Sequence, residues 1–280
     1  MTAVEDVVTR RGRRDTAGPK YLSLARTTLQ QAIAYRITTF FNVGLTFIWV
    51  IILYYLWRAA YAGRVSIAGL TWDQMRTYVV IAYGINALVG WRTGSAMMAT
   101  IRTGDIVFEM VRPLNYCTTQ IARALGFTAV EGAISLAFTL GIGLLFLDIR
   151  PPASLPAALL FGLALIIGFL TKVLIVFLVS LLTFWTLNGM GLMWSQQAIM
   201  QILSGTIVPL ALMPGWLQVI AQVLPLRGIV STPLQLYLGT TTGWSVVGLL
   251  ALQVGWLIAL WVLANLAWRR AFRIVEIQGG

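Results

Sequence analysis

One short charged segment stands between long apolar stretches, and its residue types could bind a partner. It reads Arg102-Thr103-Gly104-Asp105-Ile106-Val107-Phe108-Glu109-Met110-Val111-Arg112-Pro113. Gly104 and Asp105 favour the start of a helix, Arg112 suits the dipole at its last turn, and Pro113 stops it. The pattern predicts a short helix across a membrane face that offers apolar and charged groups to a soluble partner. The alternative is a connecting loop whose arginines only set membrane topology.

Chemistry that needs histidine or paired cysteines is excluded. The chain has no histidine, and Cys117 is its only cysteine, which rules out internal disulfides, histidine metal sites and histidine general bases. No G-x-x-x-x-G-K-[ST] phosphate loop occurs either, since the Gly239–Gly243 stretch lacks the lysine. We therefore expect no enzymatic activity, no metal site and no cofactor held by this chain.

The composition indicates a membrane protein. Hydrophobic residues make up 59% of the chain and charged residues only 10%, in continuous runs near the ~20 residues that a helix needs to cross a bilayer. The runs do not alternate as barrel strands do, so an all-α polytopic fold is expected. The net charge of +11 then fits anionic lipid headgroups rather than nucleic acid.

The N-terminal region is first basic and then amphipathic. Residues 1–18 are polar, with several arginines and no apolar core of a signal peptide, and we interpret them as a disordered cytoplasmic tail. Over residues 19–35, four apolar side chains share one helical face: Leu22, Ala25, Leu29 and Ile33. This pattern is typical of a helix that lies in the membrane interface. The alternative is a cytoplasmic extension of the first span.

Six segments are expected to cross the membrane within a single domain over residues 19–280. They are residues 37–57, 75–91, 121–147, 155–187, 192–210 and 244–267. Six spans put both termini on one side, and most lysines and arginines fall on that side. Only five fall opposite: Arg58, Arg64, Arg76, Arg150 and Arg227. The excess places both termini and the charged segment in the cytoplasm.

Residues 209–242 contain recurrent prolines separated by apolar pieces that are too short to span. Short re-entrant helices are allowed only where protein covers their freed backbone groups, so we predict an outer gate that caps a cavity. Its candidate residues are Pro209, Trp216, Pro225, Arg227 and Pro233. Of these, we expect Pro209, Trp216 and Pro225 to be buried in protein. The alternative is an exposed loop.

Two charged residues fall inside expected spans. Glu131 lies about 16 Å into the third span and Lys172 about 20 Å into the fourth, at 1.5 Å per residue. A lone charge at mid-membrane costs roughly 2.5–3.5 kcal/mol. We therefore predict that the two form an ion pair, directly or through water, that faces the bundle interior.

The order of these features resembles the ABC-2 permease family, the membrane subunits of type-2 ABC exporters. Two motifs resemble those of the small bacterial branch of this family, the multidrug or viologen exporters. They are Arg102-Thr103-Gly104-Asp105-Ile106 and Val111-Arg112-Pro113-Leu114. Pro225-Leu226-Arg227-Gly228-Ile229-Val230, Pro233 and Tyr237-Leu238-Gly239 fit the same branch.

The resemblance implies that the charged segment is a coupling helix on which a cytoplasmic ATPase acts. The coupling residues would be Arg102, Gly104, Asp105, Glu109, Arg112 and Pro113. Two ATPase subunits, which hold ATP and Mg, would serve two permeases, identical or paralogous, in a bacterial inner membrane. Aromatic and methionine-rich spans suit an amphiphile, a drug-like cation or a lipid. The alternatives are a secondary transporter, for which Glu131 and Lys172 would be the ion-coupling groups, and a membrane-embedded enzyme.

Overall fold

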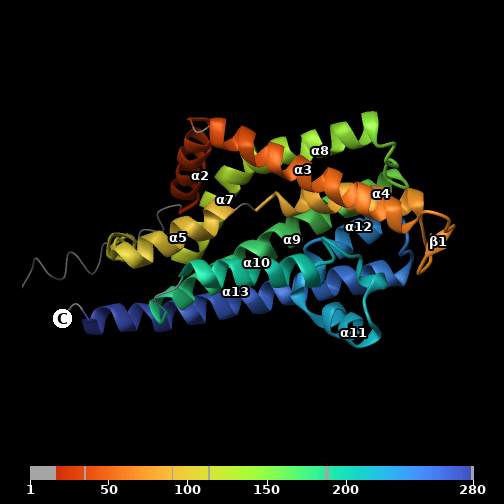
Figure 1. Cartoon of the computed structure of the whole chain (residues 1–280). Helices are drawn as coiled ribbons and strands as arrows, with labels where there is room; N and C mark the ends of the chain where they lie inside the picture. The colour runs from red at the N-terminus through yellow and green to blue at the C-terminus, as the bar shows by residue number, and fades with distance from the viewer. Residues whose placement is uncertain (1–16, 35, 90, 113, 187–188, 279–280) are drawn as a thin grey trace, which may run out of the picture.

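The computed structural model describes residues 17–278 except 35, 90, 113, 187 and 188, so most of the expected tail and Pro113 lie outside the described residues. Long helices run side by side along one axis (Figure 1), which confirms the all-α prediction. Four described helical stretches are long and apolar enough to cross a membrane, by length and composition. They are Phe40–Ala60, Tyr116–Phe146, Leu155–Phe184 and Trp244–Ala271.

Helix α2, Ala17–Ala34, runs across the axis of the other helices (Figure 1) and packs on α7, Tyr116–Phe127. The two backbones approach closely at Gly126, where an added Cβ would overlap the Thr28 hydroxyl. The separate helix expected at residues 19–35 is therefore present. Its place in a membrane interface stays a prediction.

The first long helix, α3, spans Arg36–Ala60 and leads into an antiparallel hairpin of β1, Ser66–Ile67, and β2, Leu70–Thr71. The hairpin ends directly at α4, Trp72–Asn86. Thr71 and Gln74 form a capping box there, in which each side chain bonds the other's backbone N–H. The capping box therefore defines Trp72 as the first residue of α4.

Two helices coincide with expected spans but are shorter. α4 replaces the expected span 75–91, and α10, Gly189–Leu203, replaces 192–210. Each has 15 residues, about 22 Å at 1.5 Å per residue, against a hydrocarbon core of about 30 Å. α10 stops at a turn in which Gly205 takes φ of 86° and accepts a 2.8 Å hydrogen bond from the Tyr78 hydroxyl.

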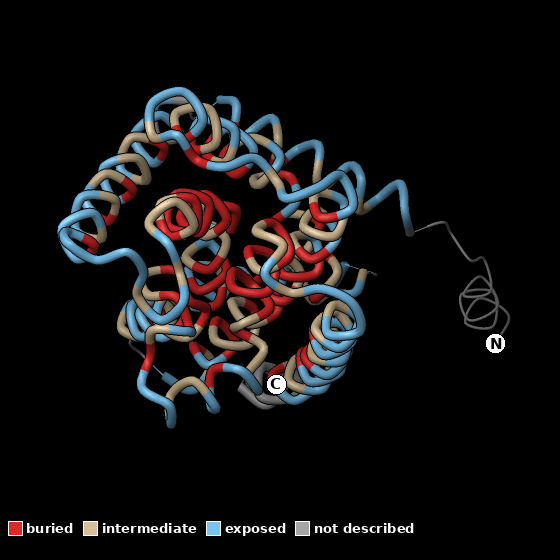
Figure 2. The backbone as a smooth tube through the Cα atoms, turned by 90° about the vertical axis from the view of Figure 1, so that its right-hand side faces the viewer, coloured by how far each residue is buried: buried red, intermediate tan, exposed pale blue. Residues whose placement is uncertain are grey.

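The third and fourth long helices differ in regularity. The third is α7 and α8, Ala133–Phe146, joined by a π-helical turn, Thr128–Gly132, that holds Glu131. The fourth is α9, Leu155–Leu181, extended by the 3₁₀ turn Leu182–Phe184. Buried residues gather on the inner helices, and the outer helices turn exposed residues outward (Figure 2).

The segment before the last helix consists of short helical pieces. They are η4, Leu210–Leu212; α11, Gly215–Val223; η5, Pro225–Gly228; and α12, Ser231–Tyr237. The last helix, α13, spans Trp244–Gln278. Its Gln253 side-chain amide donates to the backbone carbonyls of Ala164, at 2.8 Å, and Gly228, at 2.6 Å. This amide ties the short helices to both α9 and α13.

Candidate functional site

The charged segment forms a bend between two helices at one end of the bundle. α5, Trp91–Thr103, ends at Gly104, whose φ of 81° favours glycine, and α6, Ile106–Met110, follows. Arg102 therefore lies in the last turn of α5, whereas Asp105 directly precedes α6. The Asp105 side chain caps no backbone N–H; it accepts a 2.6 Å hydrogen bond from the Thr103 hydroxyl.

A buried side chain anchors α6 to the bundle. Ile106 is 2% exposed and belongs to an apolar cluster with residues of α5, α7, α9 and α13, among them Met97, Tyr116, Phe177 and Leu260. A displacement of α6 would have to move this close-packed cluster or leave a void in it. The bend is therefore mechanically connected to the long helices.

Glu109 makes two ion pairs. Its carboxylate lies 3.1 Å from the Arg112 guanidinium and 2.8 Å from that of Arg123 on α7. The Glu109 side chain is only 12% exposed, so this candidate coupling residue faces the bundle rather than solvent. Sequence reasoning missed Arg123 as its partner, because the pair is 14 residues apart and no local helical spacing connects them.

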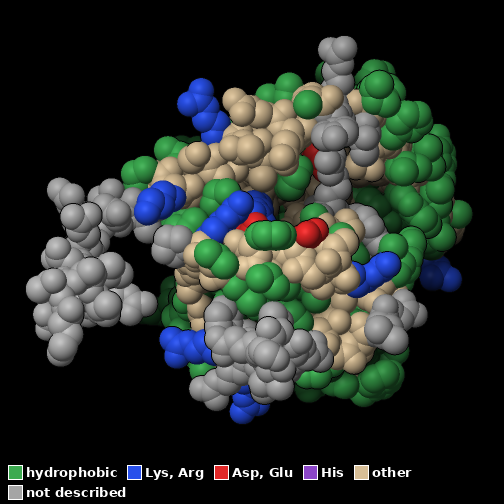
Figure 3. Space-filling model, turned by 90° about the vertical axis from the view of Figure 1, so that its left-hand side faces the viewer, with side chains coloured by type: hydrophobic (Ala, Val, Ile, Leu, Met, Phe, Trp, Pro, Cys, Tyr) green, Lys and Arg blue, Asp and Glu red, His purple; other side chains and the backbone are tan. Residues whose placement is uncertain are grey.

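The opposite side of the bend is an exposed, mainly apolar surface. Its largest apolar side chains are Phe108, 70% exposed, and Val111, 80% exposed, with Val107 beside them. Arg102, Asp105 and Arg112 are exposed around these residues. We call these six residues the α6 surface. Figure 3 views this end of the molecule and shows hydrophobic side chains with acidic and basic groups close by.

The start of α7 joins this bend to two other elements. The Asn115 backbone N–H donates to the Tyr21 hydroxyl of α2 at 3.1 Å, and its side-chain amide donates to the Asn265 side chain of α13 at 2.9 Å. Asn115 also caps α7 by accepting from the Thr118 N–H. A displacement of the bend would therefore act on α2, α7 and α13 together.

A cavity of about 570 Å³ opens next to the bend, between α2, α5, α7 and α10. Arg102 lies on its wall, so the same residue borders both the α6 surface and the cavity. The remaining wall is largely apolar and includes Phe127 and three methionines, Met98, Met190 and Met193. Methionine is flexible and polarisable and adapts to apolar ligands of different shapes.

Lys172 is 2% exposed, and its ammonium donates to the Asn86 backbone carbonyl at 2.5 Å and to the Asn86 side-chain oxygen at 3.1 Å. These bonds join α9 to the end of α4. Glu131 is also buried, at 8% exposure. The ion pair expected between Glu131 and Lys172 stays a prediction, and Asn86 is a partner that sequence reasoning did not assign.

The proposed outer-gate residues occupy different environments. Pro209 and Pro233 are buried and Pro225 is half-buried, while Arg227 donates to the Gln235 side chain at 3.2 Å. Trp216 is 68% exposed, so the expectation of its burial is wrong within this chain. α11 turns the small Ala221 inward, against Leu210 and Met213, and that leaves its bulky side chains outside.

Comparison with known sequences decides the family. A sequence model described as ABC-2 family transporter protein matches residues 31–279, from the end of α2 through α13. The chain belongs to the ABC-2 transporter family. No curated protein matches it significantly.

This membership makes the chain the membrane permease component of an ABC-2 transporter, in a family whose ATPase activity lies in partner subunits. The family resemblance found in the sequence is confirmed at that level. The matched residues include the whole bend around Gly104, α7 and α13, but only the last residues of α2. The family match indicates no substrate.

Proposed function

We propose that this ABC-2 permease is the transmembrane subunit of an ATP-driven exporter, and that its ATPase binds the α6 surface. The observation that carries the proposal is the exposure of Phe108 and Val111 on a segment anchored underneath by Ile106 and Glu109. An exposed apolar patch with a charged rim is the usual form of a protein-binding site. The anchoring makes the same segment able to transmit force.

The proposed transmission follows the contacts of α6. When ATP and Mg close the partner ATPase pair, the push on α6 passes through Glu109 and Arg123 to α7 and through Ile106 to α9 and α13. These helices then rock as bodies because their cores are close-packed. The cavity beside Arg102 would open and close to the cytoplasm in step with that movement.

For membrane topology we propose six crossings, with both termini and the α6 surface in the cytoplasm of a bacterium. The four long helical stretches supply four crossings, and α4 and α10 supply the other two. Both shorter helices run along the bundle axis beside the long ones (Figure 1). The turns that follow α4 and α10 complete the path across the bilayer.

We further propose an assembly of two permeases, identical or paralogous, above two ATPase subunits. Large apolar side chains are exposed on many of the described helices, and lipid and a second permease would share this surface. The short helices η4 to α12 would close the outer end of the translocation path between the two permeases.

The proposed substrate is an amphiphile or hydrophobic molecule, such as a drug-like cation or a lipid. The methionine-rich wall of the 570 Å³ cavity supports this class, since apolar pockets of ~300–1,000 Å³ are typical of small-molecule sites. Stimulation of ATP hydrolysis in the reconstituted complex by drugs, lipids and glycans would separate the classes. Stimulation by a glycan carrier alone would exclude an amphiphile.

The decisive experiment on function is co-purification of the permease with its ATPase from the native membrane. Phe108→Ala is expected to weaken the association at least about tenfold, because a central aromatic residue commonly contributes 2 kcal/mol or more. Phe146→Ala is the matched control, since Phe146 is 76% exposed but lies at the end of α8. Transport that persists without any associated ATPase would instead establish a secondary transporter.

A further inference from the structure

A groove of about 780 Å³ lies between the end of α9 and the last part of α13. Its walls are leucines of both helices, including Leu178, Leu182 and Leu263, and it ends at Trp185 and two adjacent arginines. Both helices are candidate membrane spans up to this level, Phe184 and Ala271. The groove therefore covers the last turns of two spans and finishes where they leave the apolar zone.

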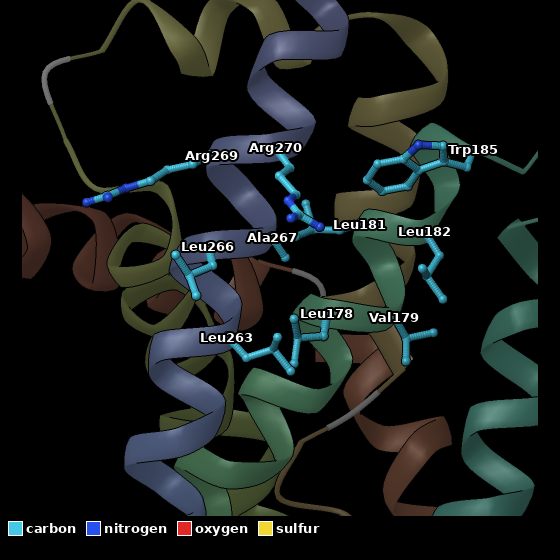
Figure 4. Close-up of a pocket in the computed structure, with 10 residues that line it drawn as sticks. All are labelled: Leu178, Val179, Leu181, Leu182, Trp185, Leu263, Leu266, Ala267, Arg269 and Arg270. Atoms are coloured by element: carbon cyan, nitrogen blue, oxygen red, sulfur yellow. The ribbon is translucent and has the colours of Figure 1, made fainter.

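The polar end of the groove is positively charged. Arg269 and Arg270 are exposed, and neither is ion-paired with any side chain that the structure describes. Figure 4 shows the Arg270 side chain directed into the space between α13 and the end of α9, whereas Arg269 extends away from it. Trp185 stands on the far side of that space, as tryptophans do at the level of lipid headgroups.

This combination selects one kind of occupant. Apolar walls on the last turns of two spans match the part of the acyl chains next to a lipid headgroup. A guanidinium at the end of these walls matches a phosphate, which arginine binds with directional hydrogen bonds. A soluble anion would not use the leucine walls, and a neutral apolar molecule would leave the arginine without a counter-ion. Anionic lipid is moreover concentrated in the cytoplasmic leaflet.

We propose that this groove is a binding site for an anionic phospholipid of the cytoplasmic leaflet, with its phosphate on Arg270 and its acyl chains along α9 and α13. The lipid would contact α9 and α13, and Ile106 of α6 packs in one apolar cluster with residues of the same two helices. The site is separate from the methionine-lined cavity; the proposal rests on the membrane topology proposed above but on neither the exported substrate nor the ATPase.

The test uses the full-length permease, stripped of lipid in mild detergent and titrated with dioleoyl phosphatidylglycerol. Bound lipid is counted by native mass spectrometry. Arg270→Gln is expected to weaken binding about fivefold, as one basic residue near a membrane surface contributes about 1 kcal/mol. Arg64→Gln removes an equal charge from an exposed turn after α3 and should leave binding unchanged, and Arg269→Gln should have less effect than Arg270→Gln.

A second variant separates the groove from general charge effects. Leu182→Trp keeps both arginines and fills the groove, and it should also lower lipid binding, because Leu182 is 45% exposed and lines the wall. Three results would overturn the proposal. They are equal binding of dioleoyl phosphatidylcholine, full displacement of the lipid by inorganic phosphate, and efficient cross-linking of Leu182→Cys to a second permease, which would make the groove an interface between copies.

Discussion

The Glu109 carboxylate and the Arg123 guanidinium lie 2.8 Å apart, and their contact fixes the short α6 against α7. Both side chains are largely shielded from solvent, at 12% and 24% exposure. An ion pair with limited exposure is screened less by salt than a surface pair. The contact is therefore suited to carry a movement of α6 into the membrane helices.

Arg123→Gln is expected to lower ATP-driven transport strongly while the permease still inserts and binds its ATPase, because the α6 surface remains but its link to α7 is lost. The exchanged pair Glu109→Arg with Arg123→Glu should recover part of the transport. Interaction energies of such neighbours are about 0.5–3 kcal/mol. Arg64→Gln is the control, since Arg64 is exposed after α3, outside the α6 surface, and its loss leaves the pair of Glu109 with Arg123 intact. Equal transport by all these variants would exclude the Glu109–Arg123 contact from coupling.

Asp105→Arg tests the α6 surface from its charged rim. Asp105 is exposed and bonds only locally, to Thr103, so reversing its charge should leave the thermal stability of the permease within about 0.5 kcal/mol. Association with the ATPase should fall, with a change in rate that depends on ionic strength. Stability is measured by thermal unfolding in detergent and association by pull-down at two salt concentrations. Unchanged association would remove Asp105 from the docking surface.

At the bend around Gly104, the sequence predicted the short helix α6 but not the separate helix α5 before it. A glycine and aspartate before a short apolar run predicted a helix start, and α6 begins there at Ile106. The sequence predicted one span over residues 75–91, because these residues form one apolar run. The structure instead ends α4 at Asn86 and begins a separate helix, α5, at Trp91. Hydropathy measures affinity for lipid; it does not locate a turn whose backbone is covered by neighbouring helices.

The pairing of Lys172 shows a second limit. Depth along two spans suggested Glu131 as its partner, and depth was the only coordinate that the sequence supplied. The Lys172 ammonium bonds Asn86 in α4, a contact that depends on how α4 and α9 are rotated and packed, which depth alone does not give. The π-helical turn at Thr128–Gly132, which places Glu131, likewise has no signal in the apolar pattern.

Lys172→Met is expected to lower the melting temperature of the permease less than Asn86→Ala does. Methionine fills the space of the lysine without a charge, whereas alanine at position 86 removes the side-chain acceptor from a buried ammonium. Loss of one hydrogen bond to a charged group costs about 1.5–3 kcal/mol, and the bond to the Asn86 backbone carbonyl remains. The double variant Asn86→Ala with Lys172→Met should recover part of the loss, and strictly additive losses would show that the Asn86 side chain does not stabilise the ammonium.

A second comparison of single and double variants tests the predicted ion pair between Glu131 and Lys172. Glu131→Gln and Lys172→Met should each lower the melting temperature, and the double variant should be more stable than the sum of the two losses predicts. Additivity here, together with coupling between Asn86 and Lys172, would assign Lys172 to Asn86 alone. Glu131 would then be examined as a cation-binding or gating group by transport assays of Glu131→Gln.

The outward face of α11 is expected to contact lipid. Trp216, Val219, Ile220 and Val223 are all about half or more exposed, and an apolar helix face of this kind lies stably in a membrane interface. A cysteine at Val219 should react slowly with a membrane-impermeant thiol reagent and readily with a lipid-soluble one. Thr242→Cys, exposed in the turn before α13, should react with both. The native Cys117 is 1% exposed and is replaced by alanine in both variants. Rapid labelling at both positions by the impermeant reagent would mean an exposed loop.

The close approach of α9 to η5 gives the most sharply controlled prediction, because α9 contains two glycines in opposite situations. A Cβ on Gly168 would lie 2.6 Å from the Gly228 carbonyl oxygen and 3.2 Å from Ile229, which are backbone atoms that cannot rotate away. A Cβ on Gly162 would meet no atom within 4 Å. Gly168→Ala should therefore destabilise the permease by about 1–3 kcal/mol through overpacking, and it should also weaken the Gln253 bond to the Gly228 carbonyl. Gly162→Ala should be neutral or stabilising by up to about 1 kcal/mol, as alanine is the better helix former. Thermal unfolding of both variants in the same detergent measures the difference. If Gly168→Ala proved as stable as Gly162→Ala, η5 would not pack against α9 as closely as the structure shows.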